Sequence, residues 1–325
     1  MATTDQHRKS IAMGDSITRA IVVSVFFMIV IAPKADAGNR SGTVSGQFLK
    51  LPTNARVSAM GNAQAALAEG ASSIGYNPAG ILSVTNASFG GTYHQWFAEI
   101  THSFYSVAVN LQEWGTVGMG MTLLTTDDMP VTDQFFPEGT GQMFKSTDVA
   151  YTVSYARQIS EDFGLGLSAK YIRSYLYNSD YRATSFAFDI GSIYDIPALR
   201  TRLGISIANL GKDLKYIYEQ YSIPSVLRFG ARITALREDD HLVYIALQVG
   251  RPNDAEEQYN LGVEYTFQNL VSLRTGYRFN YDTENWSGGL GLSLQSLGIN
   301  GSLDYAYTNY KYLSGTHMFS TEIGF

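Results

Sequence analysis

The chain of 325 residues contains no cysteine, which excludes disulfide bonds, thiolate metal sites and cysteine nucleophiles. Charged residues are scarce at 16%, and the five histidines show no spacing typical of metal ligands. The formal net charge of -6 gives no reason to expect nucleic-acid binding. No Ser/His/Asp constellation, carboxylate pair or phosphate-binding glycine loop stands out. We therefore predict a protein that is not an enzyme, without catalytic residues, metal site or cofactor.

Long apolar runs are also scarce, and the clearest one lies near the start. Ile21 to Ala32 is apolar, and the small-x-small pattern Ala35-Asp36-Ala37 follows it. The run is shorter than the roughly 20 residues that a membrane-spanning helix needs. Basic residues precede it, as in a secretory signal peptide: Arg8, Lys9 and Arg19. A membrane anchor is the alternative, but we expect residues 1–37 to be cleaved and Gly38 to become the new N-terminus.

Aromatic residues and glycine are abundant, with 22 Tyr, 17 Phe and 31 Gly at a mean hydropathy of -0.07. This balance is typical of a sheet with one apolar and one polar face. After Ser83 apolar and polar residues alternate, most clearly in residues 149–156, 163–171 and 261–267. Tyr and Phe lie near the segment ends on the apolar side, whereas the polar side carries Gly, Ser and charges of both signs. The pattern favours a membrane barrel with aromatic girdles and a polar lumen.

We expect fourteen antiparallel strands, an even number that places both ends of the barrel on the periplasmic side. A soluble sandwich would also alternate, but it does not require short connections after even-numbered strands and long ones, such as 126–146 and 210–223, after odd-numbered strands. The last segment, His317 to Phe325, ends on an aromatic residue, as closing strands of outer-membrane barrels do. The expected strands are 84–96, 99–111, 114–126, 147–158, 163–177, 182–195, 200–209, 224–236, 241–250, 257–267, 270–280, 286–295, 298–308 and 316–325.

Residues 38–83 show no strand periodicity. Ala55 to Glu69 is rich in small residues and is compatible with a short helix or a packed irregular segment. Asn77 suits a helix N-cap and Pro78 the first helical position, so a short capped helix is expected to reach Leu82.

The segment Phe48 to Leu82 resembles the opening of the PorV/PorQ family, which is itself similar to FadL-type outer-membrane transporters. The R-x-x-A-M-G run at Arg56 to Gly61 and the Y-N-P-A-G run at Tyr76 to Gly80 carry the resemblance. It implies an all-β transmembrane barrel of fourteen strands with a small N-terminal plug that contains a short helix. The expected organisation is a signal peptide (1–37), a plug (38–83) and a barrel (84–325) in the bacterial outer membrane, with both termini periplasmic.

The resemblance implies two possible functions. PorV-type members bind C-terminal signal domains of cargo in type IX secretion and PorQ-type members hold a surface partner, so the leading expectation is a protein-binding shuttle or anchoring component. FadL-type barrels pass hydrophobic small molecules through the lumen, which is the alternative. The expected partners are outer-membrane lipid together with secretion-system subunits, cargo domains or hydrophobic molecules.

Several residues are candidates for binding a ligand or partner, and each also has a structural interpretation. Asn77 and Pro78 could gate a ligand path or simply cap a helix, and capping is favoured. Phe135 and Phe136 in the first long loop, and Tyr216, Tyr218 and Tyr221 in the second, could contact a partner, fold inward as a lid or touch lipid.

Charged residues allow two further interpretations. The acids Asp127, Asp128 and Asp133 could bind calcium, but solvated surface acids are favoured. The predicted lumenal charges could select a charged solute, although a salt-bridged network that fills the interior is favoured. These lumenal residues are Arg228, Arg232, Arg274, Arg278, Asp189, Glu264, Asp304 and Glu322.

Overall fold

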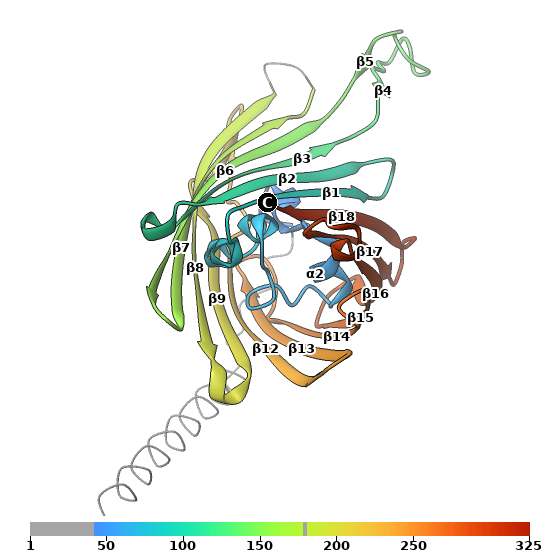
Figure 1. The fold of residues 1–325 in the computed structure, drawn as a ribbon. Coiled ribbons are helices and arrows are strands. Elements are labelled where there is room, and N and C mark those ends of the chain that lie inside the picture. The colour runs from blue at the N-terminus through green and yellow to red at the C-terminus, as the bar shows by residue number, and fades with distance from the viewer. Residues whose placement is uncertain (1–41, 178–180) are drawn as a thin grey trace, which may run out of the picture. The chain divides into compact units, whose positions relative to one another are not determined.

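The computed structural model describes residues 42–177 and 181–325, in which fourteen antiparallel strands close into a barrel (Figure 1). The predicted signal peptide, residues 1–37, lies outside the described residues. Each barrel strand overlaps one of the fourteen predicted segments, so the fold prediction is confirmed. The strands are β1 (Ala87–Gln95), β2 (Thr101–Asn110), β3 (Thr116–Thr125), β6 (Thr147–Ser160), β7 (Phe163–Tyr175), β8 (Arg182–Ile196), β9 (Thr201–Gly211), β12 (Val226–Glu238), β13 (His241–Pro252), β14 (Gln258–Phe267), β15 (Val271–Phe279), β16 (Glu284–Ser293), β17 (Gly301–Tyr310) and β18 (Thr316–Gly324).

The barrel closes where its first and last strands meet. β1 pairs with β18 from Ser88 opposite Gly324 to Gln95 opposite His317. The amide of Phe325 donates to the carbonyl oxygen of Ala87 at 2.8 Å, which extends the seam to the last residue. Closure leaves no free sheet edge, and this is what allows strands to cross a hydrocarbon layer in which unpaired backbone groups are costly.

Alternation along the strands creates two faces of opposite character. On β7 the outward Leu167 is 56% exposed, whereas the neighbouring inward Ser168 is 4% exposed. Aromatic side chains lie on the outward face of many strands, among them Phe186, Phe188 and Phe319. An outward face this apolar would be unfavourable in water, and it is the face that lipid covers in an outer-membrane barrel.

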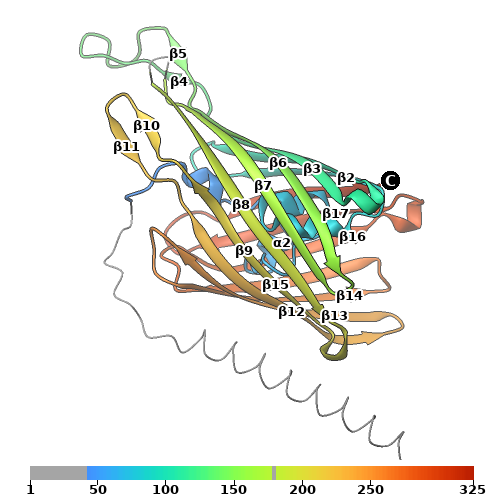
Figure 2. The ribbon, with the colours of Figure 1, turned by 90° about the vertical axis from the view of Figure 1, so that its left-hand side faces the viewer.

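The connections differ at the two ends of the barrel. Those after β2, β6, β8, β12, β14 and β16 are short and include the 3₁₀ helices η4 (Gln112–Trp114), η5 (Pro197–Leu199) and η6 (Gln295–Leu297). We call this the turn end. At the opposite loop end, two connections fold into hairpins, which both extend beyond the same end of the barrel (Figure 2). These hairpins are β4 (Met129–Pro130) with β5 (Met143–Phe144), and β10 (Leu214–Tyr216) with β11 (Glu219–Tyr221).

Inside the barrel lies the N-terminal segment, the plug, seen within the ring of strands in Figure 1. It forms η1 (Gln47–Lys50), α2 (Ala55–Ala59), η2 (Ala71–Gly75) and η3 (Pro78–Ser83). The expected helix at Ala55 therefore lasts five residues before the chain becomes irregular. None of the helices in the described part of the chain has the length and apolar character needed to cross a membrane. Four large apolar side chains of the plug are fully buried: Met60, Leu67, Ile74 and Ile81.

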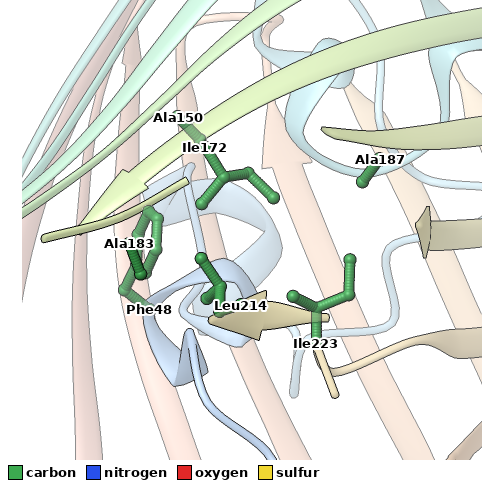
Figure 3. Close-up of a cluster of buried hydrophobic side chains, with 7 residues drawn as sticks. All are labelled: Phe48, Ala150, Ile172, Ala183, Ala187, Leu214 and Ile223. Atoms are coloured by element: carbon green, nitrogen blue, oxygen red, sulfur yellow. The ribbon is translucent and has the colours of Figure 1, made fainter. Parts of the chain in front are cut away.

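The first described residues lie at the loop end. Val44 forms a β-bridge with Ser222, next to β11. Figure 3 shows Phe48 of η1 packed with Leu214 and Ile223 of the second long loop and with Ile172 of β7. Phe325 lies at the turn end, where it pairs with Ala87. The plug thus begins near the loop end and joins β1 at the turn end.

Candidate functional site

The plug backbone lies directly against the inner barrel wall, and glycines in the wall make this contact possible. A Cβ atom at Gly276 of β15 would come within 1.9 Å of the amide nitrogen of Gly61. A Cβ at Gly166 of β7 would come within 2.4 Å of the carbonyl carbon of Pro78. No side chain fits at such distances, so glycine is required for this close backbone approach. This close approach explains why glycines lie on the inward face of these strands.

Asn77 joins the plug to itself and to the wall. Its Oδ1 accepts a hydrogen bond from the amide of Ala79 at 3.1 Å, which caps η3 as predicted, and Pro78 is the first helical residue. Its Nδ2 donates to the carbonyl oxygens of Ala65 at 2.7 Å and of Ser192 on β8 at 3.0 Å. Both polar atoms of this fully buried side chain are therefore satisfied within the protein. A role of Asn77 and Pro78 in ligand binding stays a prediction.

Glu69 of the plug is the centre of an ion cluster at the turn end. Its carboxylate lies 2.6 Å from Nη1 of Arg232 on β12, 2.8 Å from Nη1 of Arg202 on β9 and 3.3 Å from Nη1 of Arg56. Burial alone would raise the pKa of Glu69, but the three guanidinium groups outweigh it and lower the pKa to about 2. Glu69 therefore carries its charge at any physiological pH and binds two barrel strands to the plug.

A second ion cluster adjoins the first through Arg56. Glu264 of β14 accepts from Arg56 at 2.7 Å and from Arg274 of β15 at 2.5 Å, and Arg274 also donates to Asp304 of β17 at 2.6 Å. Burial lowers the pKa of Arg56, but Glu264, Glu69 and Asp304 raise it above its ordinary value. Together, the clusters around Glu69 and Glu264 form what we call the plug lock.

The predicted network of lumenal charges is thus confirmed for some residues and wrong for others. Arg232, Arg274, Glu264 and Asp304 are ion-paired as expected, and Asp189 pairs with Lys170 at 2.7 Å. Glu322 instead accepts hydrogen bonds from the plug amides of Ala71 and Ser72 and from the Ser88 hydroxyl. Within residues 42–177 and 181–325, Arg228 and Arg278 form no ion pair. Asp189, an acid near Arg228, pairs with Lys170 instead, and alternation in the sequence could not reveal this choice of partner.

Sequence reasoning missed Glu69 and Arg202 as members of the plug lock. Arg202 precedes inward-facing Gly204 and Ser206 on β9 at even spacing, so the period of two could have identified it. Glu69 lies in an irregular part of the plug, and no periodic signal marks its direction.

The β4–β5 hairpin presents apolar side chains to solvent at the loop end. Phe135 and Phe136 are 78% and 59% exposed, and the Asp133 carboxylate accepts from both of their amides at 2.7 and 2.8 Å. The aromatic pair is therefore held on an ordered turn. Asp128 lies 3.6 Å from Lys145, and within the described residues no cluster of three or more potential metal ligands occurs.

The three predicted tyrosines of the second long loop fall into two groups. Tyr216 packs against the cluster of Figure 3, and its hydroxyl donates to Oγ of Ser174 at 2.9 Å. Tyr218 at the tip of the β10–β11 hairpin is 89% exposed, and Tyr221 is 42% exposed. Tyr216 thus anchors this hairpin, whereas Tyr218 and Tyr221 remain accessible to a partner.

A fourteen-stranded barrel with its lumen filled by an N-terminal plug is the architecture of FadL-like outer-membrane proteins. Solved structures of this kind share the fold. The toluene transporter TodX of Pseudomonas putida aligns with a TM-score of 0.59 at 11% identity, over 84% of this chain and 97% of its own. The toluene transporter TbuX of Ralstonia pickettii gives 0.56 at 13% identity, over 85% and 99%. A FadL homologue of Pseudomonas aeruginosa gives 0.52 at 11%, over 83% and 97%. The protein therefore has the fold of these FadL-like β-barrels.

The family follows from the sequence comparison. Residues 34–251, well over half of the chain, match the family described as type IX secretion system protein PorV. The chain belongs to the PorV family. The match includes both sequence runs on which the resemblance was based. A comparison with curated proteins gave no match.

Proposed function

We propose that this protein is a protein-binding component of type IX secretion and that its partner docks at the loop end, on the β4–β5 and β10–β11 hairpins. Membership of the PorV family, whose description names this secretion system, is the observation that supports the proposal. The partner is a secretion-system subunit or a cargo domain.

The exposed aromatic residues support a contact surface at this end. Phe135, Phe136 and Tyr218 are exposed residues of the two hairpins. Both hairpins extend beyond the same end of the barrel (Figure 2). Exposed aromatic side chains in water are typical of protein interfaces, where their burial supplies much of the binding energy. The plug lock, in contrast, lies at the opposite end of the lumen, where its charged groups are already engaged.

The test is purification in mild detergent, followed by mass spectrometry of the proteins that remain bound. A Phe135→Ser/Phe136→Ser double variant should recover the partner at least tenfold less than the wild type. Tyr312→Ser is the matched control, because Tyr312 is an equally exposed aromatic residue (81%) in a loop-end connection outside both hairpins. Recovery of no secretion subunit or cargo domain by the wild type would count against the proposal.

The orientation in the membrane is part of the proposal. The turn end, with Phe325, faces the periplasm and the loop end faces the exterior, because bacterial barrels have short periplasmic turns and longer external loops. A protease added to intact cells should then cut the β4–β5 hairpin and spare the turn-end connections. The first described residues lie at the loop end, opposite Phe325. The periplasmic position of the N-terminus therefore stays a prediction.

A passive channel for hydrophobic molecules is the second candidate, and the similarity to TodX and TbuX in fold favours it. Ile74 and Ile81 of the plug are fully buried inside the barrel, so we expect a passage to require movement of the plug around Asn77 and Pro78. Retained hydrophobic compounds in the same purification, without protein partners, would favour this function over the first. Toluene uptake by liposomes that contain the protein, compared with an Asn77→Ala variant, tests it directly.

A further inference from the structure

Two buried arginines near the loop end of the lumen lack a counter-charge. Arg228 on β12 is 8% exposed and Arg278 on β15 is 4% exposed. In the described part of the chain neither forms an ion pair, and Nη1 of each is buried without a hydrogen-bond partner. Nη2 of Arg278 donates to the carbonyl oxygen of Ser58 at 3.2 Å. A buried guanidinium without an anion is among the most unfavourable groups in a folded protein, which points to a missing ligand.

Both arginines line the same cavity. Its volume is about 480 Å³, and it lies between η1 of the plug and the loop-end halves of β12 to β15. Tyr281, which follows β15, also lines it, and its hydroxyl accepts from Nδ2 of Asn260 at 2.9 Å. Burial raises the pKa of Tyr281, while the positive charges of Arg278 and Arg228 act in the opposite direction. Arg228, Arg278 and Tyr281 thus share the wall of one cavity.

The other charges of the cavity restrict the charge of a ligand. Asp254 is neutralised by Lys50, whose Nζ lies 2.8 Å away. Asp282 is exposed and Glu284 is half-buried, and neither is ion-paired with the arginines in the described residues. These two acids repel a multiply charged anion more strongly than a singly charged one. The cavity thus favours a monoanion.

The remaining wall determines the shape of the ligand. The side chains of Phe48, Trp96 and Tyr310 contribute apolar and aromatic surface to the cavity. A planar carboxylate matches the two parallel donors of a guanidinium group better than a spherical anion does. The volume lies within the ~300–1,000 Å³ that is typical of small-molecule sites.

We propose that this cavity binds a small monocarboxylate with an apolar body, whose carboxylate is held by Arg228 and Arg278. Benzoate is the smallest probe with both features. This proposal does not rest on the proposed secretion function. Partner recovery tests the secretion function, and benzoate binding tests the cavity.

The experiment uses the purified full-length mature protein in a maltoside detergent and isothermal titration with benzoate. Benzamide, which has the same shape but no charge, is the ligand control. Benzoate should bind and benzamide should bind at least tenfold more weakly. Arg228→Met and Arg278→Met should each reduce the affinity for benzoate at least tenfold. Arg237→Met, at an exposed arginine of the turn end, should bind benzoate as the wild type does.

Unfolding in benzoate-free buffer separates a binding role from a structural one. Methionine keeps most of the side-chain volume and removes the uncompensated charge, so both Met variants should unfold at the same or a higher urea concentration than the wild type. Benzoate should raise the unfolding midpoint of the wild type alone. Lower midpoints for both Met variants, together with equal binding of benzoate and benzamide by the wild type, would overturn the proposal. Benzoate binding that persists in the double variant would overturn it as well.

Discussion

Buried arginines differ between the two ends of the lumen, although at the loop end the buried Asp254 is paired with Lys50. At the turn end, the guanidinium groups of Arg56, Arg202 and Arg274 each contact at least one carboxylate within 3.3 Å. At the loop end, Arg228 and Arg278 are buried without an ion pair in the described residues. Arginines inside the lumen thus have a carboxylate partner at one end and none at the other in the described residues.

Paired and unpaired buried arginines differ in their roles, the first in stability and the second in ligand binding. A paired charge contributes to stability mainly because removal of one partner leaves the other buried and uncompensated. An unpaired buried charge decreases stability, and a protein retains it where a ligand supplies the missing group. The ion clusters of the turn end therefore hold the plug in place, whereas Arg228 and Arg278 at the loop end remain available for binding.

The largest effect on stability is expected for Glu264→Gln, which removes the ion pairs of Glu264 at the turn end. The neutral amide would leave Arg56 and Arg274 with one carboxylate fewer in a buried position, so the free energy of unfolding should fall by about 3–5 kcal/mol. Urea unfolding in detergent, followed by tryptophan fluorescence, measures it. Glu161→Gln, at an exposed turn residue, is the control and should leave the midpoint unchanged. A loss below about 1 kcal/mol would mean that the plug lock contributes little to stability.

A somewhat smaller effect is expected for Gly276→Ala, which displaces the plug without changing charge. The new Cβ would collide with the backbone at Gly61, and overpacking of this kind costs about 1–3 kcal/mol. Displacement of the plug should also increase ion conductance in planar bilayers. The matched control is Gly288→Ala on β16, where the nearest atom would be 3.6 Å away. Equal conductance of both variants would show that the wall adapts and the plug stays in place.

The pH dependence of the plug lock is expected to be smaller again. Because the pKa of Glu69 is lowered from 4.5 to about 2, its contribution is fully present above pH 4.5 and is lost as the pH falls toward 2. The side chain is 30% exposed, so we expect a loss of only about 1–2 kcal/mol. Unfolding midpoints from pH 7 to pH 2 test this, and Glu69→Gln should flatten the profile in the same window. A transition near pH 6 that survives in Glu69→Gln would point to another group.

The barrel could be predicted from the sequence because each strand has one face toward lipid and one toward the polar lumen. This imposes a period of two on the strands. The segment expected at 147–158 is β6, Thr147–Ser160, and that expected at 200–209 is β9, Thr201–Gly211. The N-cap at Asn77 was also predictable, because a cap depends only on adjacent residues. Local and periodic signals sufficed for these features.

The plug contacts could not be predicted in the same way. The pairing of Arg56 with Glu264 joins residues 208 positions apart, and it depends on the path of an irregular segment without periodicity. The sequence predicted Arg228 and Arg278 as members of the salt-bridged network, since inward arginines and inward acids were both present. Only the axial positions of the strands show that Glu264 lies near the turn end while these two arginines lie near the loop end.

The smallest effects on stability are expected at two tyrosines of the loop end, the anchoring Tyr216 and the accessible Tyr218. Tyr216→Phe removes the hydroxyl that contacts Ser174 and should cost about 1 kcal/mol of unfolding free energy. Tyr218→Phe should change stability by less than about 0.5 kcal/mol, because its side chain is 89% exposed. Recovery of a protein partner should follow the reverse order when each tyrosine is replaced by serine, with the stronger loss at Tyr218, because its ring is free to be buried by a partner. A loss of recovery at Tyr216 alone would mean that the hairpin's position, rather than its exposed tip, determines binding.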